Sequence, residues 1–188
     1  MERGRSRTVG AGIGALVAGA LVVVLGGVAW AHVTLQPGSL KKGATDALFS
    51  FSVPNESSDG ASVTGLEVTF PTDHPLLSVL PQTKPGWSAT VATTKLAKPV
   101  TTDDGQITEA VSTITWAATA GGVPPDQFDL FTVSVGQLPS DTGSLTFKAI
   151  QTYSDGSSVS WIEPVVKGTP APEHPAPVLK LTGKTKKS

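Results

Sequence analysis

Apolar and polar residues alternate in short runs along most of this chain, and turn residues end each run. The clearest of these runs are 47–53, 66–70, 87–91, 107–117, 128–135, 145–153 and 159–163. A period of two residues is typical of strands that bury one face, and these runs show no helical period of useful length. Pro54-Asn55 and Asp59-Gly60 are stop and turn signals, and Asp103-Asp104-Gly105 is typical of a hairpin turn.

Strands at this spacing, joined by Gly, Pro and Asp turns, predict an all-β fold, an antiparallel β-sandwich of the cupredoxin or immunoglobulin-like type. A short first strand is expected at 33–36, and the single domain is expected to span residues 32–167. From Gly168 onward the chain is rich in Pro, Lys and Thr, which predicts a disordered tail over 168–188. Its one apolar pair, Val178-Leu179, is far shorter than the roughly 20 residues of a membrane span.

The first 31 residues have the organisation of a secretory signal peptide. Three arginines open the segment, an Ala/Val/Leu/Gly run follows over about 9–28, and Ala29 and Ala31 fit the small-residue cleavage rule. We therefore expect cleavage after Ala31 and an exported protein, extracellular or associated with the cell envelope. Because the apolar run is long, retention of the leader as an uncleaved anchor is the alternative.

Charge and composition exclude several classes of function. The leader contains every arginine and Glu2, so the rest of the chain has 11 lysines against 14 acidic residues and a net charge of −3. This balance excludes a basic footprint for nucleic acid. The chain has no cysteine and its one methionine is Met1, which excludes thiolate metal sites and methionine-rich Cu(I) sites.

The expected cleavage would make His32 the first residue of the mature chain. Its α-amine and its ring Nδ1 can then close a six-membered chelate on one metal ion. Nitrogen ligands of this kind suit Cu(II), Ni(II) and Zn(II), and a tetragonal nitrogen and oxygen set is what Cu(II) prefers. The opposing interpretation is that His32 is simply the residue that follows a cleavage site, since any peptide with an N-terminal histidine binds some Cu(II).

The other histidines and the tryptophans are weaker candidates. His74 and His174 each precede a proline, which predicts extended or turn backbone, so we expect a surface loop residue and a solvated tail residue. Trp116 is expected in the core. Trp161 ends a predicted hairpin beside Glu163, where an indole face could favour a nearby cation.

The chain resembles the YcnI-like proteins, in particular their actinobacterial members. The motifs that carry the resemblance, in order, are His32-Val33-Thr34-Leu35-Gln36-Pro37, Val53-Pro54-Asn55-Glu56, Leu66-Glu67-Val68, Pro85-Gly86-Trp87, Thr113-Ile114-Thr115-Trp116, Pro124-Pro125-Asp126-Gln127-Phe128 and Gln151-Thr152-Tyr153-Ser154-Asp155-Gly156 through Trp161-Ile162. They extend over essentially the whole predicted domain, from His32 to about Pro164.

The resemblance implies an exported domain that binds Cu(II) through the amine and ring nitrogen of its N-terminal histidine, a mono-histidine brace, with a glutamate and a nearby tryptophan. The histidine corresponds to His32, and Trp161 is our choice for the tryptophan. Where family members often have two glutamates in a Pro-Gly-Glu-Phe-x-Glu-Phe motif, this chain has Gln127 and Leu130. Asp129 is then a substitute ligand if its strand face points at the metal.

Glu109 and Glu67 are further candidates for the carboxylate ligand, with the alternative that both are solvent-facing strand residues. Many relatives also carry a membrane helix after the domain, and this chain reaches Lys186-Lys187-Ser188 without one. We therefore expect no membrane span in the mature chain.

The function that we expect is copper trafficking or buffering by a binding protein that is not an enzyme, with a membrane copper transporter as a partner. A copper oxygenase of the histidine-brace kind is the enzymatic alternative, and it would need His74 or His174 as a second histidine. A metal-free binding or scaffold module outside the cytoplasm is the third hypothesis.

Overall fold

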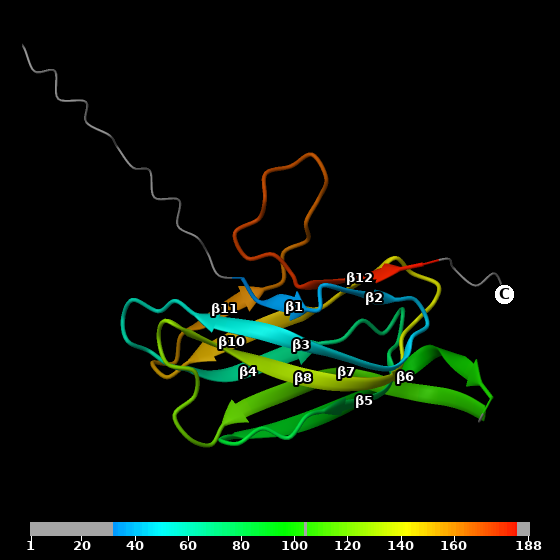
Figure 1. Cartoon of the computed structure of the whole chain (residues 1–188), viewed down its shortest axis with the longest axis horizontal. Coiled ribbons are helices and arrows are strands. Elements are labelled where there is room, and N and C mark those ends of the chain that lie inside the picture. Colours follow the sequence, from blue (N-terminus) through cyan, green and yellow to red (C-terminus); the bar gives the residue numbers. More distant parts are fainter. Residues whose placement is uncertain (1–31, 104, 184–188) are drawn as a thin grey trace, which may run out of the picture.

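The computed structural model describes residues 32–103 and 105–183, and within these ranges the chain forms strands and turns without a helix. Two antiparallel sheets pack face to face, and a smaller third sheet lies on the side of the sandwich where β1 runs (Figure 1). The predicted leader, residues 1–31, lies outside the described residues.

The first sheet has the strand order β1-β3-β8-β5. Its strands are β1 (Thr34–Gln36), β3 (Thr45–Asn55), β8 (Gln127–Gln137) and β5 (Leu77–Pro81). Short β1 is held on β3 by the pairs Thr34 with Ser52 and Gln36 with Ser50. This pairing fixes the entry of the chain into the sandwich, so the residue just before β1 has a defined position.

The second sheet has the order β11-β10-β4-β7-β6. Its strands are β11 (Ser158–Trp161), β10 (Lys148–Tyr153), β4 (Val63–Thr69), β7 (Gly105–Ala118) and β6 (Trp87–Thr102). The hairpin expected at Asp103-Asp104-Gly105 is confirmed, since Thr102 of β6 pairs with Gly105 of β7. This long hairpin reaches past the end of the sandwich, away from β1 and β11 (Figure 1).

The core lies between the two large sheets and is dominated by aromatic side chains. Phe51 contacts four other rings in edge-on or tilted arrangements, those of Phe49, Phe70, Trp116 and Phe147. Phe51 and Phe147 are fully buried, and Trp116 is buried as expected from the sequence. Such ring pairs add to the stabilisation that comes from the buried apolar area itself.

The third sheet has the order β2-β12-β9 and corrects the prediction for the C-terminal segment. Its strands are β2 (Ser39–Lys41), β12 (Val178–Thr182) and β9 (Ser144–Thr146). β12 pairs in parallel with β2 and antiparallel with β9. The domain therefore does not end at residue 167, and the prediction of disorder is wrong for residues 168–183.

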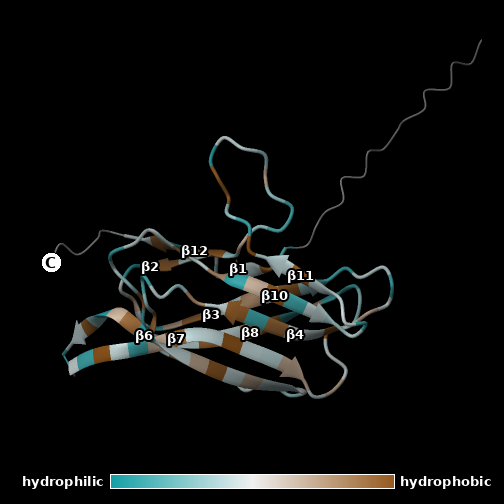
Figure 2. Ribbon diagram, turned by 180° about the vertical axis from the view of Figure 1, so that it is seen from behind, coloured by the Kyte–Doolittle hydropathy of each residue, from teal (hydrophilic) through white to brown (hydrophobic). Residues whose placement is uncertain are grey.

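The prediction failed because the alternation of buried and exposed residues in β12 is short and is preceded by a proline-rich stretch. Leu179 and Leu181 are buried, whereas Val178, Lys180 and Thr182 face outward. Figure 2 shows this hydrophobic segment of β12 against the body of the sandwich. The burial of two leucines and the pairing with two strands oppose the entropy cost of ordering this segment.

Candidate metal site

His32 lies at the entrance to the first sheet, two residues before the start of β1. The next residue, Val33, is buried in the core, and β1 is paired along β3. The imidazole of His32 is half-buried and meets the indole of Trp161 edge-on, with 5.5 Å between ring centroids and an interplanar angle of 83°. The structure thus brings together the two residues that the sequence pointed to most strongly.

Trp161 is itself held by a hydrogen-bonded chain in the interior. Its Nε1–H donates to Oε1 of Gln151 at 3.0 Å, and the Gln151 amide donates to the carbonyl oxygen of Pro54 at 2.7 Å. Gln151 is fully buried and Trp161 is 4% exposed. Because both polar ends of the amide are satisfied, the glutamine fixes the indole orientation without leaving a buried group unpaired.

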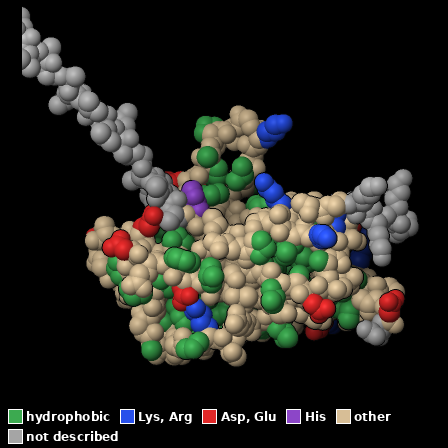
Figure 3. Space-filling model, viewed as in Figure 1, with side chains coloured by type: hydrophobic (Ala, Val, Ile, Leu, Met, Phe, Trp, Pro, Cys, Tyr) green, Lys and Arg blue, Asp and Glu red, His purple; other side chains and the backbone are tan. Residues whose placement is uncertain are grey.

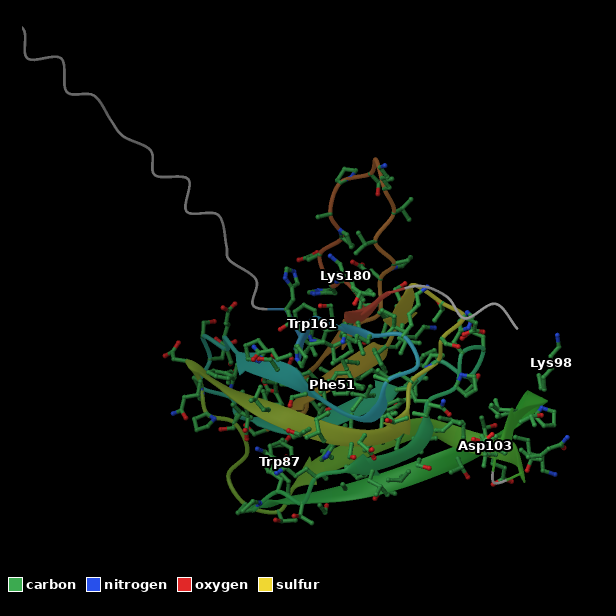
Figure 4. The ribbon with its side chains drawn as sticks, turned by 45° about the vertical axis from the view of Figure 1, so that its right-hand side comes forward. Phe51, Trp87, Lys98, Asp103, Trp161 and Lys180 are labelled. Carbon is green, nitrogen blue, oxygen red and sulfur yellow. The ribbon has the colours of Figure 1, made fainter. Side chains whose placement is uncertain are left out.

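His174 is not the solvated tail residue that the sequence indicated. Its ring packs edge-on against Trp161, with centroids 5.1 Å apart and an interplanar angle of 89°, and its Nδ1 is shielded from solvent. The indole of Trp161, labelled in Figure 4, therefore contacts two imidazoles. Sequence reasoning missed this contact because it joins a strand to a proline-rich segment.

Glu163 ties that segment to the end of β11. Its backbone N–H donates to the carbonyl of His174, its carbonyl accepts from Ala176, and its Oε2 accepts from the backbone N–H of His174 at 2.8 Å. This bridge closes the base of the loop 164–173. Glu163 follows Trp161 by two residues, which in extended backbone places both side chains on one side, and this spacing is the signal that could have identified it.

A shallow groove of about 510 Å³ runs beside His32. One wall is the edge of β1, including Thr34 and Leu35, and the other is the segment from Pro175 to Lys180. The histidine therefore sits at an opening on the surface. A small ion or a short extended ligand can reach it there.

Asp129 lies elsewhere in the fold. Asp129 is on β8, where it pairs with Val53 of β3. Its Oδ1 accepts hydrogen bonds from Nζ of Lys84 and from the backbone N–H of Leu130. The ammonium group of Lys84 also lies over the ring of Phe131. The structure does not bring Asp129 to His32, because β3 lies between β1 and β8. The carboxylate that the sequence suggested as a metal ligand instead forms a salt bridge with Lys84.

The remaining carboxylate candidates, and the two positions where the family motif has glutamate, are exposed strand positions. Glu67 accepts a long 3.5 Å hydrogen bond from Thr115, and Glu109 is exposed on the hairpin opposite Lys95. Gln127 pairs with Asn55 at the start of β8, and both Gln127 and Leu130 are exposed. The solvent-facing alternative given for Glu67 and Glu109 agrees with these positions.

His74 is paired with a different carboxylate, since its Nδ1 lies 3.1 Å from Oδ2 of Asp141. The structure gives it no contact with His32. Within residues 32–103 and 105–183, no three His, Cys, Asp or Glu side chains converge as a ready-made metal site.

Two pKa shifts occur at the hairpin that joins β10 to β11, the strands of Gln151 and Trp161. Burial raises the pKa of Tyr153 above its ordinary 10.0, and the carboxylates of Asp155 and Glu56 add to the rise. Hydrogen bonds from the hydroxyl and backbone N–H of Ser157 lower the pKa of Asp155 below 3.8. The tight Asp155 turn thus supports the strand that ends in Trp161.

The fold and the cluster around Trp161 define an immunoglobulin-like β-sandwich with a histidine at its N-terminal entrance. The chain belongs to the family described as "Domain of unknown function (DUF1775)", whose model matches residues 32–181. The resemblance to YcnI-like proteins is thereby confirmed. The match begins at His32 and extends through β12.

Two relatives support this assignment. The copper-binding protein CutI of Bacillus subtilis (strain 168) is 30% identical over 131 residues, which cover 70% of this chain and 55% of CutI. The match thus spans about half the length of that relative. A solved structure of an uncharacterized protein from Nocardia farcinica, with an immunoglobulin-like fold, is 37% identical at a TM-score of 0.63, covering 81% of this chain and 99% of the other.

No helix in the described part of the chain is long and apolar enough to cross a membrane.

Proposed function

We propose that this protein binds Cu(II) as a cargo through the α-amine and ring Nδ1 of His32, after removal of the leader at Ala31. The observation that carries the proposal is the position of His32. It is the first residue of the family match, it stands two residues before β1, and its ring is set against an indole that is fixed in the interior. The relative CutI is a copper-binding protein, which supports the same cargo here.

The donor set fits the cargo chemically. An imidazole and an amine are nitrogen ligands suited to Cu(II), and carboxylate oxygen can complete a tetragonal set. The carboxylate that the fold places in the cluster around Trp161 is that of Glu163, since Glu163 binds the backbone of His174 and His174 contacts Trp161. We propose Glu163, in place of Asp129, as the carboxylate whose negative charge raises the affinity of the site for Cu(II).

The biological role that we propose is copper trafficking or buffering outside the cytoplasmic membrane, with delivery to a membrane copper transporter. A site at the surface, beside an open groove, suits transfer by ligand exchange. We propose a binding protein and not an oxygenase, because the histidine-brace oxygenases place two imidazoles on one copper, whereas His32 and His174 are each set against Trp161.

The test compares three proteins that differ only at the start of the chain. One begins at His32, the second carries His32→Ala, and the third begins at His32 with an acetylated α-amine, which preserves the imidazole and blocks the amine as a ligand. Tight Cu(II) binding by the first and loss in both others supports the chelate. Equal affinity in the acetylated protein would contradict it, and His74→Ala serves as the matched histidine control.

A further inference from the structure

The loop 164–173 projects from the sandwich beside the candidate metal site. Its base is closed by the bridge between Glu163 and His174, and it rises above β11 and β12 (Figure 1). Its tip is a turn in which the N–H and the hydroxyl of Thr169 both donate to the carbonyl of Val166. Gly168 has a φ of 89°, as the third position of a type II turn requires.

The rising arm of this loop exposes apolar side chains to solvent. Val165 is 65% and Val166 55% exposed, and Lys167 follows at the turn. These two adjacent apolar side chains do not pack in the core of the domain, so their burial does not stabilise the fold. An apolar tip flanked by lysine is suited to the boundary between lipid headgroups and acyl chains.

The outward face of the neighbouring third sheet is positively charged. Lys41 on β2 and Lys180 on β12 are both exposed, because Leu179 and Leu181 point into the core and the alternate residues point out. The other outward side chains of this sheet are Ser, Thr and Val. Figure 3 shows lysine side chains on the loop and along the edge above β2 and β12.

The carboxylates near this face are those of Asp141, which precedes β9 and lies 3.1 Å from Nδ1 of His74, and of Glu163 and Glu173. The side chain of Glu163 is turned onto the backbone of His174, and Glu173 is the one acidic residue within the loop itself. In the sequence, three further lysines, Lys184, Lys186 and Lys187, follow shortly after β12. By sequence alone, residues 178–188 contain four lysines and no acidic residue, whereas the chain after the leader has a net charge of −3.

We propose that Val165, Val166, Lys167, Lys41 and Lys180 form a membrane face that docks on a bilayer containing anionic phospholipids. The valines enter the interface and the lysines pair with headgroup phosphates. Each lysine near an anionic bilayer strengthens binding by about fivefold, and the attraction is screened by salt. Lys180 also lines the groove beside His32, so docking would hold the metal site close to the lipid surface.

The test is vesicle flotation with protein that begins at His32, because the leader would itself bind lipid. This protein contains every strand and the whole core described above. We expect it to float with phosphatidylcholine vesicles that contain phosphatidylglycerol and to remain unbound with phosphatidylcholine alone. Raising the salt concentration should release it. Absence of flotation with the anionic vesicles would overturn the proposal.

Matched variants locate the face. Val165→Ser with Val166→Ser should weaken binding by roughly tenfold, and Lys41→Glu with Lys180→Glu by more than that. The apolar control is Leu80→Ser on β5, which is 66% exposed. The charge control is Lys95→Glu with Lys98→Glu on the distant hairpin, where Lys98 is seen in Figure 4. Controls that weaken binding as much as the face variants would overturn the proposal. No copper is present, so the copper-binding proposal is not at issue.

Discussion

The indole N–H of Trp161 donates to Oε1 of Gln151 at 3.0 Å, and both side chains are buried. The same indole contacts the rings of His32 and His174. The hydrogen bond therefore links the buried Gln151 to the two histidines of the candidate site. The orientation of the candidate site therefore depends on a glutamine that touches neither histidine ring directly in the contacts described.

Replacing Gln151 should affect both stability and copper binding. Gln151→Leu removes the donor to the Pro54 carbonyl and leaves the buried Trp161 N–H without its acceptor, and the unpaired indole N–H alone costs about 1–3 kcal/mol. We expect a lower free energy of unfolding by urea denaturation and weaker Cu(II) binding in the folded fraction. Ile150→Val on the same strand is the control. A Gln151→Leu protein with unchanged stability would contradict the account of the indole.

The two carboxylates offered for the site should respond differently. Asp129→Asn should leave Cu(II) affinity unchanged, because Asp129 is bound to Lys84 with β3 between its strand and β1. Glu163→Gln keeps an acceptor for the His174 N–H but removes the charge, and we expect affinity to fall by about tenfold, on the scale of lost outer-shell partners. Competition titrations of both variants decide this. A loss in Asp129→Asn alone would restore the interpretation from the sequence.

The C-terminal strand should be essential to the fold. Leu179 is fully buried, so Leu179→Ala should reduce the free energy of unfolding by about 2–5 kcal/mol. Val178→Ala, at an outward position of the same strand, should cost far less. Chemical denaturation of the two variants measures the difference, and equal effects would indicate that β12 does not pack on the core.

Alkaline pH should weaken the fold through Tyr153. Its pKa is raised in the folded state, so its contribution to stability is present below pH 10.0 and is lost as the pH rises through the folded value. Tyr153 is the only tyrosine in the chain, so the absorbance of tyrosinate reports its titration alone. Tyr153→Phe should remove this part of the alkaline loss of stability. A tyrosine that titrates at its ordinary pKa would contradict the prediction.

Much of the sandwich follows from local pattern. The alternation in 47–53 gave the inward set Phe49, Phe51 and Val53 of β3, and Asp103-Asp104-Gly105 gave the hairpin. β12 was missed because its alternation is short and lies in proline-rich sequence. Parallel pairing with β2 adds no local signal, since it joins segments about 140 residues apart.

Some residues of the candidate site could likewise be predicted from local sequence, and others could not. His32 could be identified because the leader and the chelate chemistry are both local in sequence. His174 and Gln151 could not, because their roles exist only through contacts with Trp161. Asp129 was misleading because the sequence could not show that Lys84 reaches it from the loop between β5 and β6.

The pH dependence of copper binding should follow the α-amine. An ordinary α-amine has a pKa of about 7.7–8.0, and it must lose its proton before it can bind a metal. Occupancy at limiting Cu(II) should therefore rise with pH through this range. In the protein whose His32 α-amine is acetylated, the rise should disappear from this range, and an unchanged rise there would contradict the prediction.

The measurement that tests the central claim most directly is a Cu(II) competition titration of protein beginning at His32, beside a short peptide with the same first residues. If the fold around Trp161 builds the site, the protein should bind one Cu(II) far more tightly than the peptide does. Peptide-like affinity would contradict the account, because the histidine would then be an incidental chelate on an exported sandwich.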